Sequence, residues 1–301
     1  MPAHGDGFHV GGVRPDEPRP ARQPASGLGR GRGRIGVSRR PDDRTRTDGH
    51  GPDRPDPMVS TVPTAAADQR IRALAAIVPA HNEQELLPDC LASLGRAASH
   101  PAVADIRILL LVVADQCIDR TAAVAYRAGA QVALTEARNV GVARSVGAAR
   151  AVEILEREGI CDRQIWLAYT DADSTVPPDW FARHLAYAGQ GWSAVLGMVQ
   201  VSDWSPRPPG TARLFRELEA HVPEHHRVHG ANLGVRADVY RRAGGFPALP
   251  VGEDHALTAS LRRLGFRVKI AEDMVVDTSA RVSGRIDGGF SDYLTDIEPE
   301  T

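Results

Sequence analysis

The chain has 301 residues, a formal net charge of −2 and 42% hydrophobic residues, which suits one large domain or two small ones. The balanced charge provides no overall basic field, and this argues against nucleic acid or an anionic membrane surface as a partner. The three cysteines lie far apart without CxxC spacing, which argues against a disulfide framework and a cysteine-based zinc site.

The longest apolar run, residues 106–114, is too short for a membrane span, which needs about 20 residues. The beginning of the chain also lacks the hydrophobic segment of a signal peptide. We therefore expect a cytoplasmic protein without an integral membrane segment, while peripheral contact with a membrane stays open.

Residues 1–68 are rich in Gly, Pro, Arg and Asp and poor in large apolar residues. Such a segment cannot bury enough surface to offset the entropy of ordering it, so we predict a disordered tail. An arginine-rich tail that binds RNA or acidic partners is the alternative, although interspersed aspartates weaken it. Met58 opens a natural-looking start, so translation could begin there. Residues 69–301 are predicted to form the folded domain.

Residues 74–78 predict the first buried strand, which the sequence Pro-Ala-His-Asn-Glu follows. Asn82 and Glu85 have the spacing of a capping box for the next helix. The apolar positions of that helix form a single stripe, as expected for a helix packed on a sheet. They are Leu86, Leu87, Cys90, Leu91 and Leu94.

Residues 106–114 are apolar throughout, which is typical of a strand covered on both faces, and the run ends at Asp115. Asp119 is predicted to cap a helix that starts near Arg120, and Gly129 to end it. A short strand over residues 131–134 follows. Next comes a long helix whose start is rich in Gly and Arg and which Gly159 closes.

Residues 165–169 read as another buried strand, and Asp171 and Asp173 come just after it. In an extended segment, residues i and i+2 point to the same side, so the two carboxylates repel each other unless a cation or a hydroxyl-rich ligand lies between them. This pattern favours a site for a divalent metal and a nucleotide. An acidic loop in which Asp173 or Ser174 caps a helix is the alternative.

The remaining chain continues the alternation of helices and strands. Because strands and helices alternate at this length, we predict an α/β fold: a single Rossmann-like domain with a mostly parallel central sheet flanked by helices. The end of the chain, from about residue 275, is polar and contains glycines. The later predicted elements are helices at 180–187 and 211–221, a strand at 193–201, a short helix to residue 242, a helix that Gly265 ends, and a strand after it.

Acidic residues fall at three predicted strand ends or helix starts, and these ends should converge on one crevice at the carboxyl edge of the sheet. Several arginines lie near the same points, although each alone could be an ordinary surface charge. Carboxylates and arginines around one crevice suit a magnesium or manganese diphosphate, because the metal takes oxygen ligands and arginines bind phosphate oxygens. The residues are Asp115, Asp171, Asp173, Glu253, Asp254, Arg138, Arg144, Arg281 and Arg285.

The order of these motifs resembles the family 2 glycosyltransferases, which have the GT-A fold, over about residues 74–285. The similar segments, in chain order, are VPAHNEQELLPDCLASL, VVADQCIDRT, GVARSVGAARA, DAD, HGANLGVR with GGF, and GEDHAL. The chain departs from the family pattern at Ala114, where an Asp is usual, and at Ser145, where an Asn is usual. The family's QxxRW motif is not visible, which favours transfer of one sugar over polymerisation.

The resemblance implies a role for each matching position. Asp254 would be the catalytic base and Asp173 the ligand of Mn²⁺ or Mg²⁺. The nucleotide-diphosphate sugar, with uridine as the default base, would contact Pro79, His81, Glu83, Asp115, Arg144, Asp171 and Arg281. Gly230, Asn232 and Glu253 would lie on the side of an unidentified acceptor. Inversion at the anomeric carbon is expected, while retention stays open.

Two other enzyme classes and a non-enzyme remain as alternatives. A sugar-phosphate nucleotidyltransferase would open with a Gly-rich loop and a signature lysine, but the only lysine is Lys269. A catalytically silent scaffold that binds nucleotide sugars is the second alternative. His221 and His225 spell an HxxEH zinc-protease pattern, but Pro223 disrupts the helix that this pattern needs. His225, His226 or His229 could instead border the site or lie in a solvated loop.

Overall fold

A computed structural model of the chain describes residues 70–221, 228–284 and 289–299. These residues all belong to one compact unit, Ser60–Thr301. The predicted disordered tail, residues 1–68, lies outside the described residues, as do His225, His226 and Arg285.

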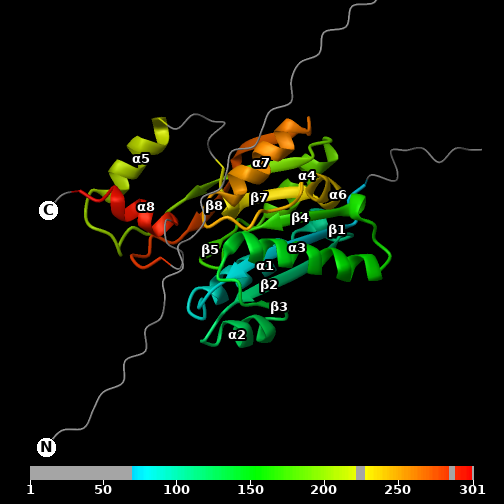
Figure 1. The fold of residues 1–301 in the computed structure, drawn as a ribbon, viewed down its shortest axis with the longest axis horizontal. Coiled ribbons are helices and arrows are strands. Elements are labelled where there is room, and N and C mark those ends of the chain that lie inside the picture. The colour runs from blue at the N-terminus through cyan, green and yellow to red at the C-terminus, as the bar shows by residue number, and fades with distance from the viewer. Residues whose placement is uncertain (1–69, 222–227, 285–288, 300–301) are drawn as a thin grey trace, which may run out of the picture. The chain divides into compact units, whose positions relative to one another are not determined.

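Eight strands form one sheet in the order β3-β2-β1-β4-β7-β6-β8-β5 (Figure 1). From β3 to β4 all neighbours are parallel, and β6 and β8 are parallel as well, which confirms the predicted mostly parallel sheet. Strand β7 is antiparallel to both of its neighbours, and β5 is antiparallel to β8. The strands are β1 (Ala73–Ala80), β2 (Arg107–Asp115), β3 (Gln131–Thr135), β4 (Ile165–Tyr169), β5 (Ser174–Thr175), β6 (Ala194–Gln200), β7 (Leu233–Arg236) and β8 (Val268–Thr278).

Helices cover both faces of the sheet, which explains why β1 and β4 are buried along their whole length. Side chains alternate between the faces of a strand, so Ala75 and Ile77 pack with α3, α6 and α7, whereas Leu74 and Ala76 pack with α1, α2 and α4. The helices are α1 (Leu87–Ala98), α2 (Thr121–Arg127), α3 (Val140–Arg157), α4 (Trp180–Gly189), α5 (Thr211–His221), α6 (Ala237–Arg242), α7 (Glu253–Arg263) and α8 (Phe290–Asp296).

The predicted capping box of α1 is wrong. The helix begins at Leu87 after Leu86, which makes no side-chain cap hydrogen bond. Asn82 lies four residues before Leu86, in the left-handed region with φ 54°, and its Oδ1 accepts a hydrogen bond from the Ile118 N–H at 2.9 Å. The local signal failed because the asparagine joins the loop after β1 to the loop after β2.

The alternative in which Ser174 caps a helix is also wrong, because α4 starts only at Trp180. Ser174 belongs to β5, which pairs with β8, and its Oγ lies 2.9 Å from Oγ1 of Thr278. This pairing closes the far edge of the sheet directly after the two aspartates.

The sequence did not predict α8, because the end of the chain is polar and contains several glycines. The helix packs its aromatic residues against α5, and Phe215 lies 5.9 Å from Phe290 and 6.4 Å from Tyr293 between ring centroids. Together with Trp204, these rings form a small second core beside the main sheet.

Within the described part of the chain, no helix combines the length and the apolar character that crossing a membrane requires.

Candidate functional site

A cavity of about 550 Å³ lies at the carboxyl ends of β1, β2 and β4. This is the edge at which the sequence predicted a crevice, and α3, α7 and the segment after β8 complete its wall. Apart from Asn232, and from Arg285, which lies outside the described residues, the predicted site residues line it: Pro79, His81, Glu83, Asp115, Arg138, Arg144, Asp171, Asp173, Gly230, Glu253, Asp254 and Arg281.

Arg144 joins two walls of the cavity. It projects from the start of α3, where Asn139 caps the helix by accepting the N–H of Val142 at 3.0 Å. The guanidinium is buried and forms ion pairs with Asp171, at 2.7 Å, and with Glu253. Arg144 therefore connects the loop after β4 to the start of α7, a structural task that the sequence did not predict.

Gly230 gives the Arg144 guanidinium its space. A Cβ atom at Gly230 would lie 2.5 Å from Nη1 of Arg144, and the two ion pairs prevent that side chain from moving away.

We expect Gly230→Ala to lower the free energy of unfolding by about 1–3 kcal/mol, the usual cost of overpacking, as measured by urea denaturation. Gly95→Ala is the matched control, because a Cβ there meets nothing within 4 Å and the residue lies inside α1. That variant should gain about 0.5–1 kcal/mol. Equal stability of the two variants would show that Gly230 is not needed for space.

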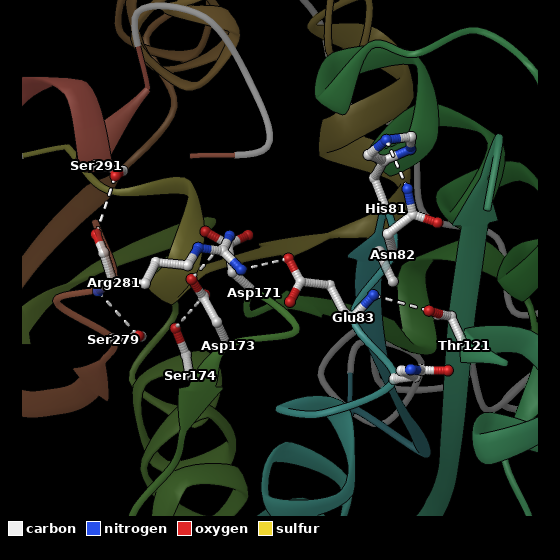
Figure 2. Close-up of polar contacts among 12 residues, drawn as sticks. His81, Asn82, Glu83, Thr121, Asp171, Asp173, Ser174, Ser279, Arg281 and Ser291 are labelled. Carbon is white, nitrogen blue, oxygen red and sulfur yellow. Dashed lines mark hydrogen bonds and ion pairs between the residues drawn. The ribbon is translucent and has the colours of Figure 1, made fainter. Parts of the chain in front are cut away.

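A second arginine, Arg281, lies between two carboxylates of the cavity (Figure 2). Nη1 of Arg281 is 2.6 Å from Oε1 of Glu83, and its Nη2 is 3.1 Å from Oδ2 of Asp173. Burial raises the pKa of Asp173 to about 6. Arg281 opposes this rise, and the carboxylates of Asp171 and Glu83 add to it.

The described residues contain no group of three or more His, Cys, Asp or Glu side chains that could hold a metal. Mg²⁺ commonly uses only one or two protein carboxylates and takes its other ligands from phosphates and water. Asp173 fits this mode, because its carboxylate lines the cavity and, together with Glu83, pairs with the guanidinium of Arg281. The donor set therefore fits a divalent cation that arrives together with a diphosphate.

Asp115 and His81 shape the end of the cavity near β1 and β2. The carboxylate of Asp115 accepts the N–H groups of Arg138 and Asn139, both at 2.8 Å, and fixes the turn before α3. Nδ1 of His81 donates to the carbonyl oxygen of Asp115 at 2.7 Å, since a carbonyl can only accept. This wall is thus held rigidly by backbone contacts.

Asp254 lies in the first turn of α7 and is half-buried. Its Oδ2 accepts the N–H of Gly230 at 2.8 Å, and its Oδ1 accepts the N–H of His255 at 2.7 Å. These two contacts orient the carboxylate on the cavity wall, while the neighbouring Glu253 points to Arg144.

Asn232 is fully buried and does not line the cavity. Its Nδ2 donates to the carbonyl oxygens of Met198 and Met274, at 2.8 and 2.9 Å, and its Oδ1 accepts from Nε1 of Trp180 at 2.9 Å. It therefore ties β6, β8 and α4 together beneath the site.

Several cavity residues were missed by the sequence analysis, above all Phe290, Ser291 and Tyr293 from α8. The apolar spacing of Phe290, Tyr293 and Ile297 is helical and was the available signal. His229 also lines the cavity, whereas His225, His226 and most of the HxxEH pattern lie outside the described residues.

A mostly parallel sheet with a carboxylate-lined cavity at its carboxyl edge is typical of a GT-A domain. The model of the family described as Glycosyl transferase family 2 matches residues 75–242, more than half of the chain. The chain therefore belongs to glycosyltransferase family 2, as the order of its motifs indicated.

Solved structures share the fold. The S. aureus TarS fragment 1–349 in complex with UDP-GlcNAc matches with a TM-score of 0.54 and 16% identity, over 72% of this chain and 61% of that chain. The mannosyltransferase PcManGT from Pyrobaculum calidifontis, in complex with GDP-Man and Mn²⁺, has a TM-score of 0.50 and 21% identity, over 72% and 59% of the two chains. The chain thus spans about three fifths of each relative. A comparison with curated protein sequences gives no significant match.

Proposed function

We propose that this protein is a glycosyltransferase that moves one sugar from a nucleotide-diphosphate sugar to an acceptor hydroxyl, with inversion at the anomeric carbon. The observation that carries this proposal is the single cavity that Asp171, Asp173 and Asp254 line together in a family 2 domain. The enzyme would belong to the hexosyltransferases, class EC 2.4. A cytoplasmic location, expected from the sequence, remains part of the proposal.

The residues divide the work between the donor and the acceptor. Asp254 takes the proton of the acceptor hydroxyl, whose oxygen forms a bond to the anomeric carbon as the bond to the diphosphate breaks. Pro79, His81 and Asp115 hold the nucleobase, and Asp171 contacts the ribose. Arg281 lies near the diphosphate and neutralises its charge.

Asp173 would hold the divalent cation, Mn²⁺ or Mg²⁺, which when bound stabilises negative charge on the departing diphosphate. Two relatives of the same fold support the choice of donor, since their structures contain UDP-GlcNAc and GDP-Man, the latter with Mn²⁺. Uridine is the default base in this family. Because the two donors carry different bases, the choice of base needs a direct test.

A thermal-shift panel of UDP- and GDP-sugars, with and without Mn²⁺, tests the donor. A ligand at 100 times its Kd stabilises the folded state by about 2.7 kcal/mol, which is a readily measured shift in Tm. Asp173→Asn should remove the Mn²⁺ dependence of this shift. Asp179→Asn is the control and should keep it, because Asp179 forms a partly exposed ion pair with Arg183. If no nucleotide sugar stabilises the wild-type protein, the proposal is wrong. Binding without transfer to any acceptor would favour a scaffold.

The pKa of Asp173 predicts how cation binding depends on pH. A carboxylate must lose its proton to bind a metal, so Mn²⁺ affinity should be full well above pH 6 and fall about tenfold per pH unit below it. Electron paramagnetic resonance of Mn²⁺ with a nucleotide sugar and no acceptor present measures this affinity without turnover, and the diphosphate of a nucleotide sugar does not itself titrate near pH 6. In Asp173→Asn the residual affinity should lose the step near pH 6. A step at the same pH in that variant would assign the metal to another group.

A further inference from the structure

Arg207 is a buried arginine in the loop between β6 and α5. Its side chain has no exposed surface, and all five of its N–H groups have acceptors. Nε donates to the Ala280 carbonyl oxygen at 2.9 Å, Nη1 to Thr295 Oγ1 at 2.8 Å and Glu298 Oε1 at 2.7 Å, and Nη2 to the carbonyl oxygens of Arg281 and Ser291.

This network joins two segments of the chain. The carbonyl oxygens of Ala280 and Arg281 belong to the chain just after β8, whereas the other acceptors belong to α8 and the residues after it. Ser291 adds to the junction, because its Oγ lies 2.9 Å from the Arg281 carbonyl oxygen. A buried charge is costly unless it is fully hydrogen-bonded, so Arg207 holds both segments in one arrangement.

The segment that Arg207 holds carries Arg281, whose side chain reaches into the cavity. Figure 2 shows the backbone of Arg281 beside Ser291 and its guanidinium between Glu83 and Asp173. Arg207 itself does not line the cavity. Among its hydrogen-bond partners, Arg281 and Ser291 line the cavity, so its effect on the site passes through these two residues.

We propose that Arg207 is a positioning residue of the donor site: it fixes the backbone at Ala280 and Arg281 so that the Arg281 guanidinium meets Glu83, Asp173 and the donor diphosphate. The part that concerns the diphosphate rests on the proposed function. The part that concerns the segment is independent of any ligand.

The first test needs no ligand. In Arg207→Met, hydrogen–deuterium exchange of the free protein should be at least about tenfold faster in residues 279–284, since several buried hydrogen bonds are lost. Exchange in β1 should stay unchanged. Arg213→Met is the matched control, because Arg213 lies nearby on α5 but is solvent-exposed. Unchanged exchange in residues 279–284 would overturn the proposal.

The second test links the segment to the donor. Arg207→Met should weaken the Kd for the nucleotide sugar about tenfold, and Arg207→Lys should fall between that variant and the wild type, because an ammonium cannot reach five acceptors. Combined with Arg281→Met, Arg207→Met should weaken binding no further, since both changes act through one side chain. Additive losses would contradict a positioning role.

Two controls keep the outcomes separate. If Arg207→Met does not fold, Thr295→Val removes one acceptor of Arg207 with little change of shape, and the same exchange and Kd effects should appear at smaller size; their absence overturns the proposal. If the wild type binds no nucleotide sugar, the proposed function fails, and the exchange result alone decides whether Arg207 positions the segment.

Discussion

Asp254→Asn is expected to lower turnover by about 10²–10⁴-fold, the usual contribution of a general base, while donor affinity stays near that of the wild type. The asparagine keeps the size of the side chain and can still accept one of the two N–H groups, from Gly230 or His255, that orient the carboxylate. It cannot take up the proton of an acceptor hydroxyl. The proposed donor contacts come from other residues of the cavity, so the donor should bind as before.

The measurement is release of the nucleoside diphosphate, with an acceptor found by screening hydroxyl compounds, alongside the donor Kd. Asp238→Asn is the matched control, because Asp238 also lies in the first turn of a helix, α6, but pairs with Arg236 and does not line the cavity. That variant should turn over normally. Unchanged turnover in Asp254→Asn would remove Asp254 as the base.

Local sequence signals predicted the parts of the fold that are buried on both faces. Strand β4 has the predicted bounds, residues 165–169. Both of its faces are buried, so all five of its residues are apolar and the strand stands out in the sequence. Strand β7 is different: its four residues give no sign that they run antiparallel between β4 and β6. Pairing over such distances is set by the whole sheet and not by local preference.

In the site, too, local patterns predicted some features, whereas contacts between distant parts of the chain could not be predicted. Residues at strand ends, such as Asp115 and Asp171, could be placed because the carboxyl ends of parallel strands meet at one edge. The Arg144–Glu253 pair spans 109 positions of sequence, and no local pattern marks its partners. At Asn82 a local pattern was present but misleading. The sequence has the spacing of a capping box, yet the asparagine side chain accepts a long-range hydrogen bond from Ile118 instead of capping α1.

Arg144→Met should lower the free energy of unfolding by about 3–5 kcal/mol, because it leaves Glu253 buried without its partner. Asp171, the other partner, is about one-third exposed and can be hydrated by water, so it contributes less to the loss. Arg150→Met is the matched control on the same helix, because Arg150 pairs with Glu153 at the surface. That variant should lose no more than about 0.5 kcal/mol in urea denaturation.

The pH dependence of Arg144→Met identifies the cause. Burial raises the pKa of Glu253 above its ordinary value of 4.5, and Arg144 opposes this rise in the wild type. Without Arg144, the folded state binds a proton at Glu253 more tightly than the unfolded state does. Its stability should therefore be highest near pH 4.5 and fall as the pH rises through the raised pKa, by at most about 1.4 kcal/mol per pH unit.

Arg144→Met/Glu253→Gln separates this effect from all other titrations. The glutamine cannot ionise, so the double variant should be more stable than Arg144→Met at pH 8, and the difference should shrink as the pH falls toward 5. A difference that does not change with pH would mean that lost packing around Arg144, including its contact with the Phe246 ring at 5.7 Å, causes the destabilisation. The buried charge of Glu253 would then not be what Arg144 neutralises.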